Sequence, residues 1–198
     1  GRVPLPGYIR EGIAQSDDVE RYQTVFATQP GSAAAPTAGL HFTPSLLHTI
    51  AERGIKKAEV TLHVGIDTFR PISTDKIEDH EMHSEWCTVS EGTAMAVHET
   101  QQRHGRVVAV GTTAVRSLET AAHSGVAESY SGATKLYIRP GYSFRVVDGI
   151  LTNFHMPRTT LMVLVSEFAG HEFIQRAYKE AMGNGYRFLS YGDAMLIL

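Results

Sequence analysis

The chain has 198 residues, close to the size of one domain, and 42% of them are hydrophobic, so we expect a packed core and exclude a disordered or collagen-like chain. Cys87 is the single cysteine, which excludes an internal disulfide and a multi-cysteine zinc site. The net charge of −3 gives no overall field that would attract nucleic acid, although a local basic face could still do so.

The chain begins with Gly rather than Met, and its first residues are rich in Pro and Gly. We expect residues 1–16 to be a linker or the lead-in to a domain, residues 17–198 to form one α/β catalytic domain, and the chain to be part of a longer protein. The longest apolar stretches are far shorter than the roughly 20 residues that span a bilayer, and the N-terminus lacks the apolar core of a signal peptide. We therefore expect a cytoplasmic protein without membrane contact.

In the first half of the chain, the sequence signals are local and strong. Thr43 is a hydroxyl N-cap, Pro44 suits the first helical position, and the apolar residues that follow have helical spacing, so a helix is predicted that ends at Gly54. Ser90 is predicted to cap a second helix that ends at Gly105. Strands are predicted at residues 58–64 and 85–89.

The second half alternates strands and helices. Residues 106–110 predict a strand, and Gly111-Thr112-Thr113 opens a helix through Ala122. The other predicted elements are strands at 135–138, 149–152 and 187–191 and helices at 159–168 and 171–182. This alternation predicts an α/β domain with a largely parallel sheet, in which sites collect at the carboxyl ends of the strands.

The turn at Gly111-Thr112-Thr113 is a candidate anion site. Free backbone amides, two hydroxyls and the guanidinium of Arg116 could converge there on a phosphate or a carboxylate. A hydroxyl N-cap beside a solvated arginine is the alternative, because a single glycine is a far weaker signal than a glycine-rich phosphate loop.

Several histidines lie near the ends of predicted elements, where they could act as a general acid or base. His41, His63 and His155 are the three such positions, although a lone histidine there is more often a satisfied structural residue. His80 and His83 have carboxylates nearby, but their spacing matches neither the His-Glu-x-x-His helix nor a zinc finger, so structural or catalytic roles without a metal are favoured.

Two familiar kinds of enzyme are unsupported. The chain has no Gly-x-Ser-x-Gly elbow, and Cys87 lies inside a predicted strand without an obvious basic partner, so a nucleophilic hydrolase is not indicated. The Gly-x-Gly-x-x-Gly fingerprint of dinucleotide-binding proteins is also absent. The residues alone therefore indicate an α/β enzyme with histidines near strand ends and a candidate anion pocket.

Sequence blocks along the whole chain resemble a known family. They are Leu5-Pro6 with Tyr8-Ile9, Asp18 with residues 21–25, residues 31–43, His63-Val64-Gly65 with Thr68-Phe69, His80-Glu81-Met82-His83 with Glu85, residues 110–113 with Arg116 and Leu118-Glu119, Asp148 with residues 152–155 and Pro157, and residues 186–188 with 190–195. In these blocks the chain is similar to the S-adenosylmethionine:tRNA ribosyltransferase-isomerases of queuosine biosynthesis. Asp67 departs from the glycine that the family often has at that turn.

The resemblance implies a fold and a reaction. The fold would be a distorted TIM-barrel-like α/β domain, and the small β-barrel domain of the family would lie outside this chain. The reaction would transfer and isomerise the ribosyl part of S-adenosylmethionine onto 7-aminomethyl-7-deazaguanine at the wobble position of tRNA, giving epoxyqueuosine-tRNA, adenine and methionine. S-Adenosylmethionine would be a co-substrate, with no tightly bound cofactor.

Two other functions stay open beside this reaction. One is a non-catalytic tRNA-binding or assembly module, and the other is a methyltransferase that would give S-adenosylhomocysteine, against which the missing glycine fingerprint weighs. The oligomeric state is also open, with a monomer favoured.

The implied chemistry needs a base for the proton next to the sulfonium, donors for the departing adenine and groups that hold the methionine carboxylate. We expect the acid and the base to be among His41, His63, His80, His83 and His155. The residues expected to bind S-adenosylmethionine are Thr37, Gly39, Gly111, Thr112, Thr113, Arg116 and Asn153.

Further residues are expected to hold other parts of the substrates. Of the residues at the helix start, Thr112, Thr113 and Arg116 would grip the methionine carboxylate or a tRNA phosphate. Asp193 would hold the ribose hydroxyls or the substrate amine, with a turn or helix cap as the alternative. Contacts to tRNA phosphates are expected from Arg139, Arg145, Arg158 and Arg176, with Tyr or Phe side chains stacking on an extruded base.

Overall fold

The computed structural model describes residues 4–32, 34–65 and 72–198, so Asp67 and the Thr68-Phe69 block lie outside the described part. The described residues form a mixed α/β structure with two three-stranded sheets. In the first sheet β2 (Glu85–Val89) lies between β1 (Val60–His63) and β4 (Tyr130–Thr134). In the second sheet β5 (Gly149–Asn153) lies between β3 (Val108–Val110) and β6 (Ala194–Ile197).

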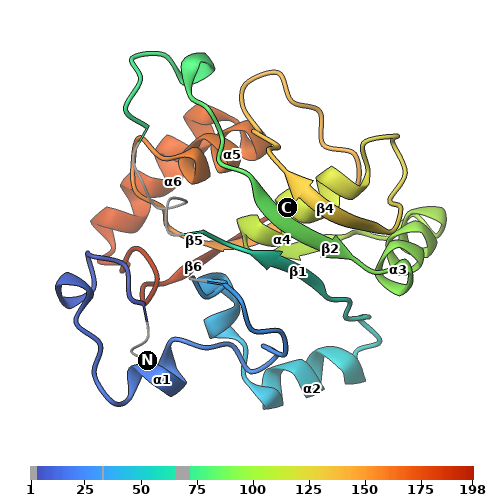
Figure 1. Cartoon of the computed structure of the whole chain (residues 1–198), viewed down its shortest axis with the longest axis horizontal. Helices are drawn as coiled ribbons and strands as arrows, with labels where there is room; N and C mark the ends of the chain where they lie inside the picture. Colours follow the sequence, from blue (N-terminus) through green and yellow to red (C-terminus); the bar gives the residue numbers. More distant parts are fainter. Residues whose placement is uncertain (1–3, 33, 66–71) are drawn as a thin grey trace.

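Helices surround the two sheets. The α-helices are α1 (Asp18–Arg21), α2 (Pro44–Glu52), α3 (Glu91–Gln102), α4 (Thr112–Ala121), α5 (Thr160–Ala169) and α6 (His171–Gly183), and the 3-10 helices are η1 (Arg10–Gly12), η2 (Thr37–His41) and η4 (Ile77–Asp79). In Figure 1, α5 and α6 lie together on one side of the molecule, α3 lies on the opposite side and α2 lies at the lower edge. No helix in the described part is long and apolar enough to cross a membrane.

The prediction of a largely parallel sheet is wrong. β3 and β5 are parallel, with Ala109 opposite Ile150, whereas the pairs β1–β2, β2–β4 and β5–β6 are antiparallel. The physical reason is that the intervening helices do not return the chain to the same sheet: α3 leads from β2 to β3, and α4 leads from β3 to β4, each from one sheet to the other. The α/β class is confirmed, but the described sheets do not join into a barrel.

Two predicted strands are also wrong. Residues 135–138 follow β4 rather than form a strand, and residues 187–191 belong to a turn that precedes β6. The turn forms because Leu189 adopts a positive φ of 70° and because the backbone at Gly192 approaches the Phe188 carbonyl so closely that a side-chain Cβ would lie 2.4 Å from its oxygen.

The predicted helix starts are confirmed where a hydroxyl caps the first turn. The side chain of Thr43 accepts a hydrogen bond from the amide of Leu46 at 3.1 Å. Ser90 caps α3 and Thr159 caps α5 in the same way. Such caps satisfy amides that have no partner inside the helix, so these signals could be found in the local sequence.

The main core lies where α4, α5 and α6 pack on the second sheet. Val115, Ile150 and Val165 have no exposed surface. A smaller cluster around Leu62 and Cys87 lies under the first sheet. Both cores consist of hydrophobic side chains, whose removal from water is the main favourable term in folding.

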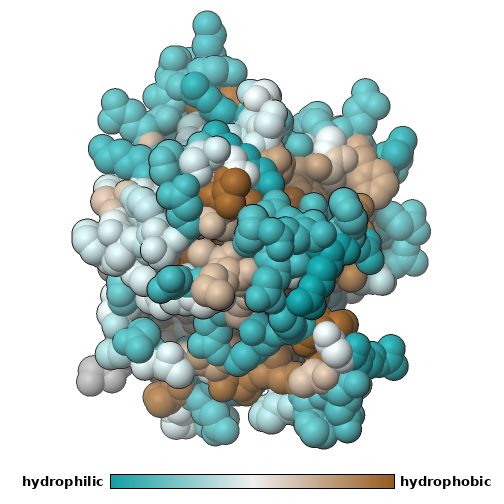
Figure 2. Space-filling model, turned by 90° about the vertical axis from the view of Figure 1, so that its right-hand side faces the viewer, coloured by the Kyte–Doolittle hydropathy of each residue, from teal (hydrophilic) through white to brown (hydrophobic). Residues whose placement is uncertain are grey.

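One helix is not covered by the rest of the described chain. α2 has no buried residue, although its apolar residues have helical spacing, and it leaves Leu46 exposed. Figure 2 shows the side of the molecule that lies at the right of Figure 1: its surface is mainly hydrophilic, with hydrophobic residues gathered toward the lower edge, where Figure 1 places α2.

Candidate functional site

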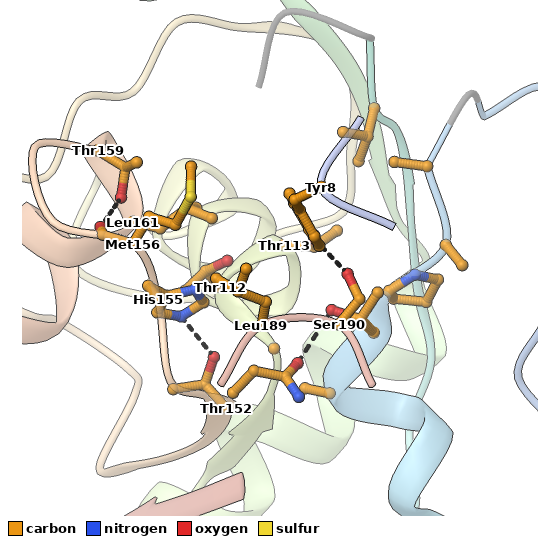
Figure 3. Close-up of a pocket in the computed structure, with 18 residues that line it drawn as sticks. Tyr8, Thr112, Thr113, Thr152, His155, Met156, Thr159, Leu161, Leu189 and Ser190 are labelled. Atoms are coloured by element: carbon orange, nitrogen blue, oxygen red, sulfur yellow. Dashed lines mark hydrogen bonds between the residues drawn. The ribbon is translucent and has the colours of Figure 1, made fainter. Parts of the chain in front are cut away.

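A pocket lies where β3 and β5 end and α4 begins (Figure 3). Because β3 and β5 are parallel, their carboxyl ends meet at one edge of the sheet, where α/β proteins commonly bind ligands. The pocket is lined by Tyr8, Ala34, Ala35, Pro36, Thr37, Ala38, Val64, Gly111, Thr112, Thr113, Thr152, Asn153, His155, Met156, Thr159, Leu161, Leu189 and Ser190.

The wall of the pocket carries no charged side chain from Asp, Glu, Lys or Arg among the described residues. Its titratable groups are Tyr8 and His155, and its remaining polar groups are hydroxyls, one carboxamide and backbone. Met156, Leu161 and Leu189 supply an apolar part of the wall. The pocket therefore suits a ligand that combines a flat or apolar part with a few polar groups.

The start of α4 offers unused hydrogen-bond donors. Gly111 precedes the helix with a φ of 85°, which glycine adopts without strain, and no side chain caps this end. Its amide bonds to the Leu151 carbonyl at 2.8 Å, which fixes the turn to β5. Within the described chain the amides of Thr112 and Thr113 have no acceptor, so both are available to a ligand.

His155 reaches the pocket from the segment that follows β5. Its Nε2 lies 2.9 Å from the Thr152 hydroxyl, and its backbone amide donates to the Tyr178 hydroxyl at 2.7 Å. Burial lowers the pKa of the imidazole to about 4, because a charged ring loses its hydration there. The ring is therefore neutral at pH 7.

A chain of side-chain contacts fixes the amide of Asn153, which is 2% exposed. The Thr37 hydroxyl donates to Asn153 Oδ1 at 2.9 Å, and Asn153 Nδ2 lies 3.2 Å from Nε2 of His41. Thr37 and Asn153 line the pocket, whereas His41 stands behind them. His41 thus contacts a pocket residue without itself reaching the pocket.

The two ends of the chain meet at the opposite wall. The Tyr8 hydroxyl lies 2.6 Å from the Ser190 hydroxyl, and both residues line the pocket. Behind them the carboxylate of Asp18 accepts hydrogen bonds from Arg10 and, at 3.0 Å, from the Tyr191 hydroxyl. The hydrogen bond from Arg10 is the largest cause that lowers the pKa of Asp18 to about 2.

Arg116 lies away from the pocket, against the expectation from the sequence. It is 5% exposed, its guanidinium binds the carboxylate of Glu85, and its Nε donates to the Leu136 carbonyl at 3.1 Å. The reason is that the side chain leaves α4 toward the first sheet, where a buried cation needs a carboxylate partner. Arg116 links α4 to β2 and cannot reach the amides at the helix start without leaving Glu85.

The other expected histidines also lie outside the pocket wall. The His63 ring packs where Gly31 has no side chain: a Cβ there would lie 2.9 Å from the imidazole. His80 contacts the Tyr137 ring edge-on, with centroids 5.7 Å apart, and His83 is exposed. In the described chain no group of His, Cys, Asp and Glu could hold a metal ion.

Gly39 and Asp193 have local structural roles in the described chain. A Cβ at Gly39 would lie 2.6 Å from the ring of Phe26, so this glycine permits a close approach and is not part of the pocket wall. The Asp193 carboxylate accepts from the Arg187 amide at 2.7 Å and from its guanidinium at 3.1 Å, which closes the turn before β6. Hydrogen bonding by this amide lowers the pKa of Asp193.

The structure also brings residues to the pocket that no residue-level argument had selected. Among them are Tyr8, Thr152, Thr159, Leu189 and Ser190. Tyr8, Thr152 and Ser190 stand inside the sequence blocks that carry the resemblance. Those blocks were the available signal, since a hydroxyl or a leucine on its own has no distinctive spacing.

The chain is similar in sequence to known proteins. The sequence family described as "Queuosine biosynthesis protein" matches residues 1–197. A protein from Heliobacterium modesticaldum, named S-adenosylmethionine:tRNA ribosyltransferase-isomerase, is 54% identical over 200 residues, which cover 100% of this chain and 58% of that protein. A protein of the same name from Thermotoga maritima is 52% identical over 198 residues, again 100% of this chain and 58% of the relative.

A solved structure is also similar. The crystal structure of S-adenosylmethionine tRNA ribosyltransferase from Thermotoga maritima matches with a TM-score of 0.68 and 46% identity, over 82% of this chain and 51% of that chain. Fold and pocket define an α/β protein with an uncharged ligand pocket at the carboxyl ends of two parallel strands. The chain belongs to the queuosine biosynthesis protein family, and it spans about 58% of the length of the curated relatives it matches.

Proposed function

We propose that this chain supplies the S-adenosylmethionine-binding and catalytic part of an S-adenosylmethionine:tRNA ribosyltransferase-isomerase. The reaction transfers and isomerises the ribosyl moiety onto 7-aminomethyl-7-deazaguanine at the tRNA wobble position and gives epoxyqueuosine-tRNA, adenine and methionine. The observation that carries the proposal is similarity through the whole chain, at 54% and 52% identity, to relatives of that name. The pocket supports it, because its polar groups and apolar wall suit a nucleoside with an amino acid side arm.

His155 is our candidate for the base that removes the proton next to the sulfonium. Of the five histidines considered, it is the one that lines the pocket in the described chain. Its low pKa keeps the ring unprotonated at neutral pH, and its contact with Thr152 orients the ring. The proton that the base removes is acidic, since the neighbouring sulfonium stabilises the carbanion that forms.

The other pocket residues have proposed roles in holding S-adenosylmethionine. The Thr37 hydroxyl holds the side-chain amide of Asn153 in place, and this amide would form hydrogen bonds with the ribose or the base. Met156, Leu161 and Leu189 offer apolar contact to the adenine. S-Adenosylmethionine is a co-substrate in this proposal, with no other cofactor.

The proposed tRNA contacts use exposed cations. Arg139, Arg145, Arg158 and Arg176 are all exposed, as contacts with phosphates require. We further propose that the protein works in the cytoplasm as a monomer, and that a distorted barrel-like domain forms in the longer protein, to which the two sheets described here would contribute.

Adenine release tests the proposal. This chain and a version extended to the length of its relatives are incubated with S-adenosylmethionine and tRNA that bears the aminomethyl base, and free adenine is followed by chromatography. Adenine that depends on the modified tRNA is expected. His155→Gln should lower its rate at least about 100-fold, because positioned proton transfer contributes that much, whereas His123→Gln, at an exposed histidine, should leave the rate unchanged.

Other outcomes identify the alternatives. S-Adenosylhomocysteine in place of adenine would indicate a methyltransferase. Binding of tRNA without adenine from either version would favour a non-catalytic binding module. An undiminished rate in His155→Gln would remove His155 as the base and leave the transferase proposal standing.

A further inference from the structure

We propose that the start of α4 is the subsite for the methionine carboxylate of S-adenosylmethionine, and that the Thr112 hydroxyl is one of the groups that bind it. The inference rests on the proposed function and assigns one end of the substrate to one corner of the pocket. It therefore also fixes the direction in which the substrate lies, with its amino acid arm at α4.

The first observation is the set of donors at this corner. The amides of Thr112 and Thr113 have no acceptor in the described chain, and Gly111 provides no capping side chain. Both threonines line the pocket (Figure 3). Two neighbouring amides at a helix start can bind the two oxygens of a carboxylate, and the helix dipole adds a favourable charge interaction.

The second observation is independent of the helix end. Thr112 is only 8% exposed and lines the pocket. Its hydroxyl makes no hydrogen bond to any described residue. The hydroxyl is therefore free to bind a ligand in the pocket, and hydrogen bonds to charged groups are the stronger ones. A carboxylate oxygen would satisfy that hydroxyl, whereas a purely apolar ligand would leave it unpaired.

The charge and shape of the corner select the class of anion. The guanidinium of Arg116 is bound to Glu85 outside the pocket, and the pocket wall has no Lys or Arg among the described residues, so a multiply charged phosphate would lack counter-charges. A phosphodiester of tRNA continues into sugar on both sides and needs an open groove. A carboxylate is a terminal group with a single charge, and it fits beside a residue as buried as Thr112.

The test compares two ligands on matched variants. The ligands are S-adenosylmethionine and its decarboxylated form, which lacks only the carboxylate, and dissociation constants are measured by calorimetry on the chain and on its extended version. Thr112→Val removes the hydroxyl and keeps the shape. Thr112→Ser keeps the hydroxyl. Thr61→Val makes the same change on β1, outside the pocket wall.

We expect Thr112→Val to weaken binding of S-adenosylmethionine about tenfold, the effect of losing one hydrogen bond to a charged group. Binding of the decarboxylated ligand should stay within about twofold in every variant, since no carboxylate is present to lose a contact. Thr112→Ser and Thr61→Val should bind both ligands like the parent protein. This pattern would assign the carboxylate to the α4 corner.

The contrary outcomes are distinct. Equal weakening of both ligands by Thr112→Val would place the hydroxyl against another part of the ligand and overturn the subsite, as would no weakening of either. Binding of neither ligand by the parent protein would overturn the proposed function, and the subsite with it. Binding of both ligands together with a flat response to Thr112→Val would overturn the subsite alone.

Discussion

The imidazole of His155 is held neutral by its surroundings, and this has a consequence for stability. Burial lowers its pKa to about 4 in the folded protein, whereas an unfolded histidine titrates near about 6.5. As the pH falls from about 6.5 to about 4, the unfolded chain takes up a proton that the folded chain refuses. The folded state should therefore lose stability in this window, by about 3 kcal/mol in total.

Urea unfolding between pH 7 and pH 4 measures this loss. In His155→Gln the free energy of unfolding should depend much less on pH across the window, because the titrating group is gone. His123→Gln, which removes an exposed histidine, should keep the slope of the parent protein. Equal slopes in all three proteins would show that His155 is not buried as an uncharged group.

α4 anchors the loop that leads to β5 through one buried carboxylate. Glu119 has no exposed surface and accepts hydrogen bonds from the amides of Arg145, Val146 and Val147 at 3.0–3.1 Å and from the Tyr142 hydroxyl at 2.9 Å. Four donors compensate for the lost hydration of the charge. Because β5 carries Thr152 and Asn153 into the pocket, this anchor positions the site indirectly.

We expect Glu119→Gln to lower the free energy of unfolding by about 3 kcal/mol, since the new NH2 group would face backbone donors and leave them without an acceptor. Urea denaturation measures the change. Glu81→Gln makes the same substitution at an exposed position and should change the stability by less than about 0.5 kcal/mol. A similarly small effect at Glu119 would mean that the loop does not depend on this carboxylate.

The beginning and the end of the chain hold each other in place beside the pocket. Tyr8 and Ser190 are 182 positions apart in the sequence, and Tyr191 donates to Asp18 across a comparable span. The Tyr191 ring also contacts the Tyr22 ring edge-on at 5.9 Å. The segment that was expected to be a linker or lead-in therefore contributes a residue, Tyr8, to the pocket wall.

Tyr191→Phe should lower the free energy of unfolding by about 1–2 kcal/mol, because it removes a hydrogen bond to a charged and buried carboxylate. Tyr186→Phe removes the hydroxyl of an exposed tyrosine and serves as the matched control with little expected change. In Asp18→Asn the further substitution Tyr191→Phe should cost less than it does alone, since the two groups share one interaction. Additive effects in thermal or urea unfolding would contradict the link.

The sequence identified candidates for the site better than it assigned their roles. The expected turn at Gly111-Thr112-Thr113 lies at the pocket, and His155 lies there as expected for a residue beyond a strand end. Arg116 was expected there because the helix that this turn opens carries it, but its partner Glu85 is 31 positions away. Local spacing places a side chain on a helix, whereas its partner depends on which element packs against that face.

By itself the sequence determined the α/β class, the capped helices and the resemblance to the family, because periodicity, N-caps and short sequence blocks are properties of neighbouring residues. Only the tertiary structure decided that, among the described strands, one pair is parallel and three are antiparallel, and which of the described histidines reaches the pocket. Strand direction and pocket composition depend on contacts between residues far apart in the chain. Those contacts are selected by the packing of the whole core, which no local stretch of sequence contains.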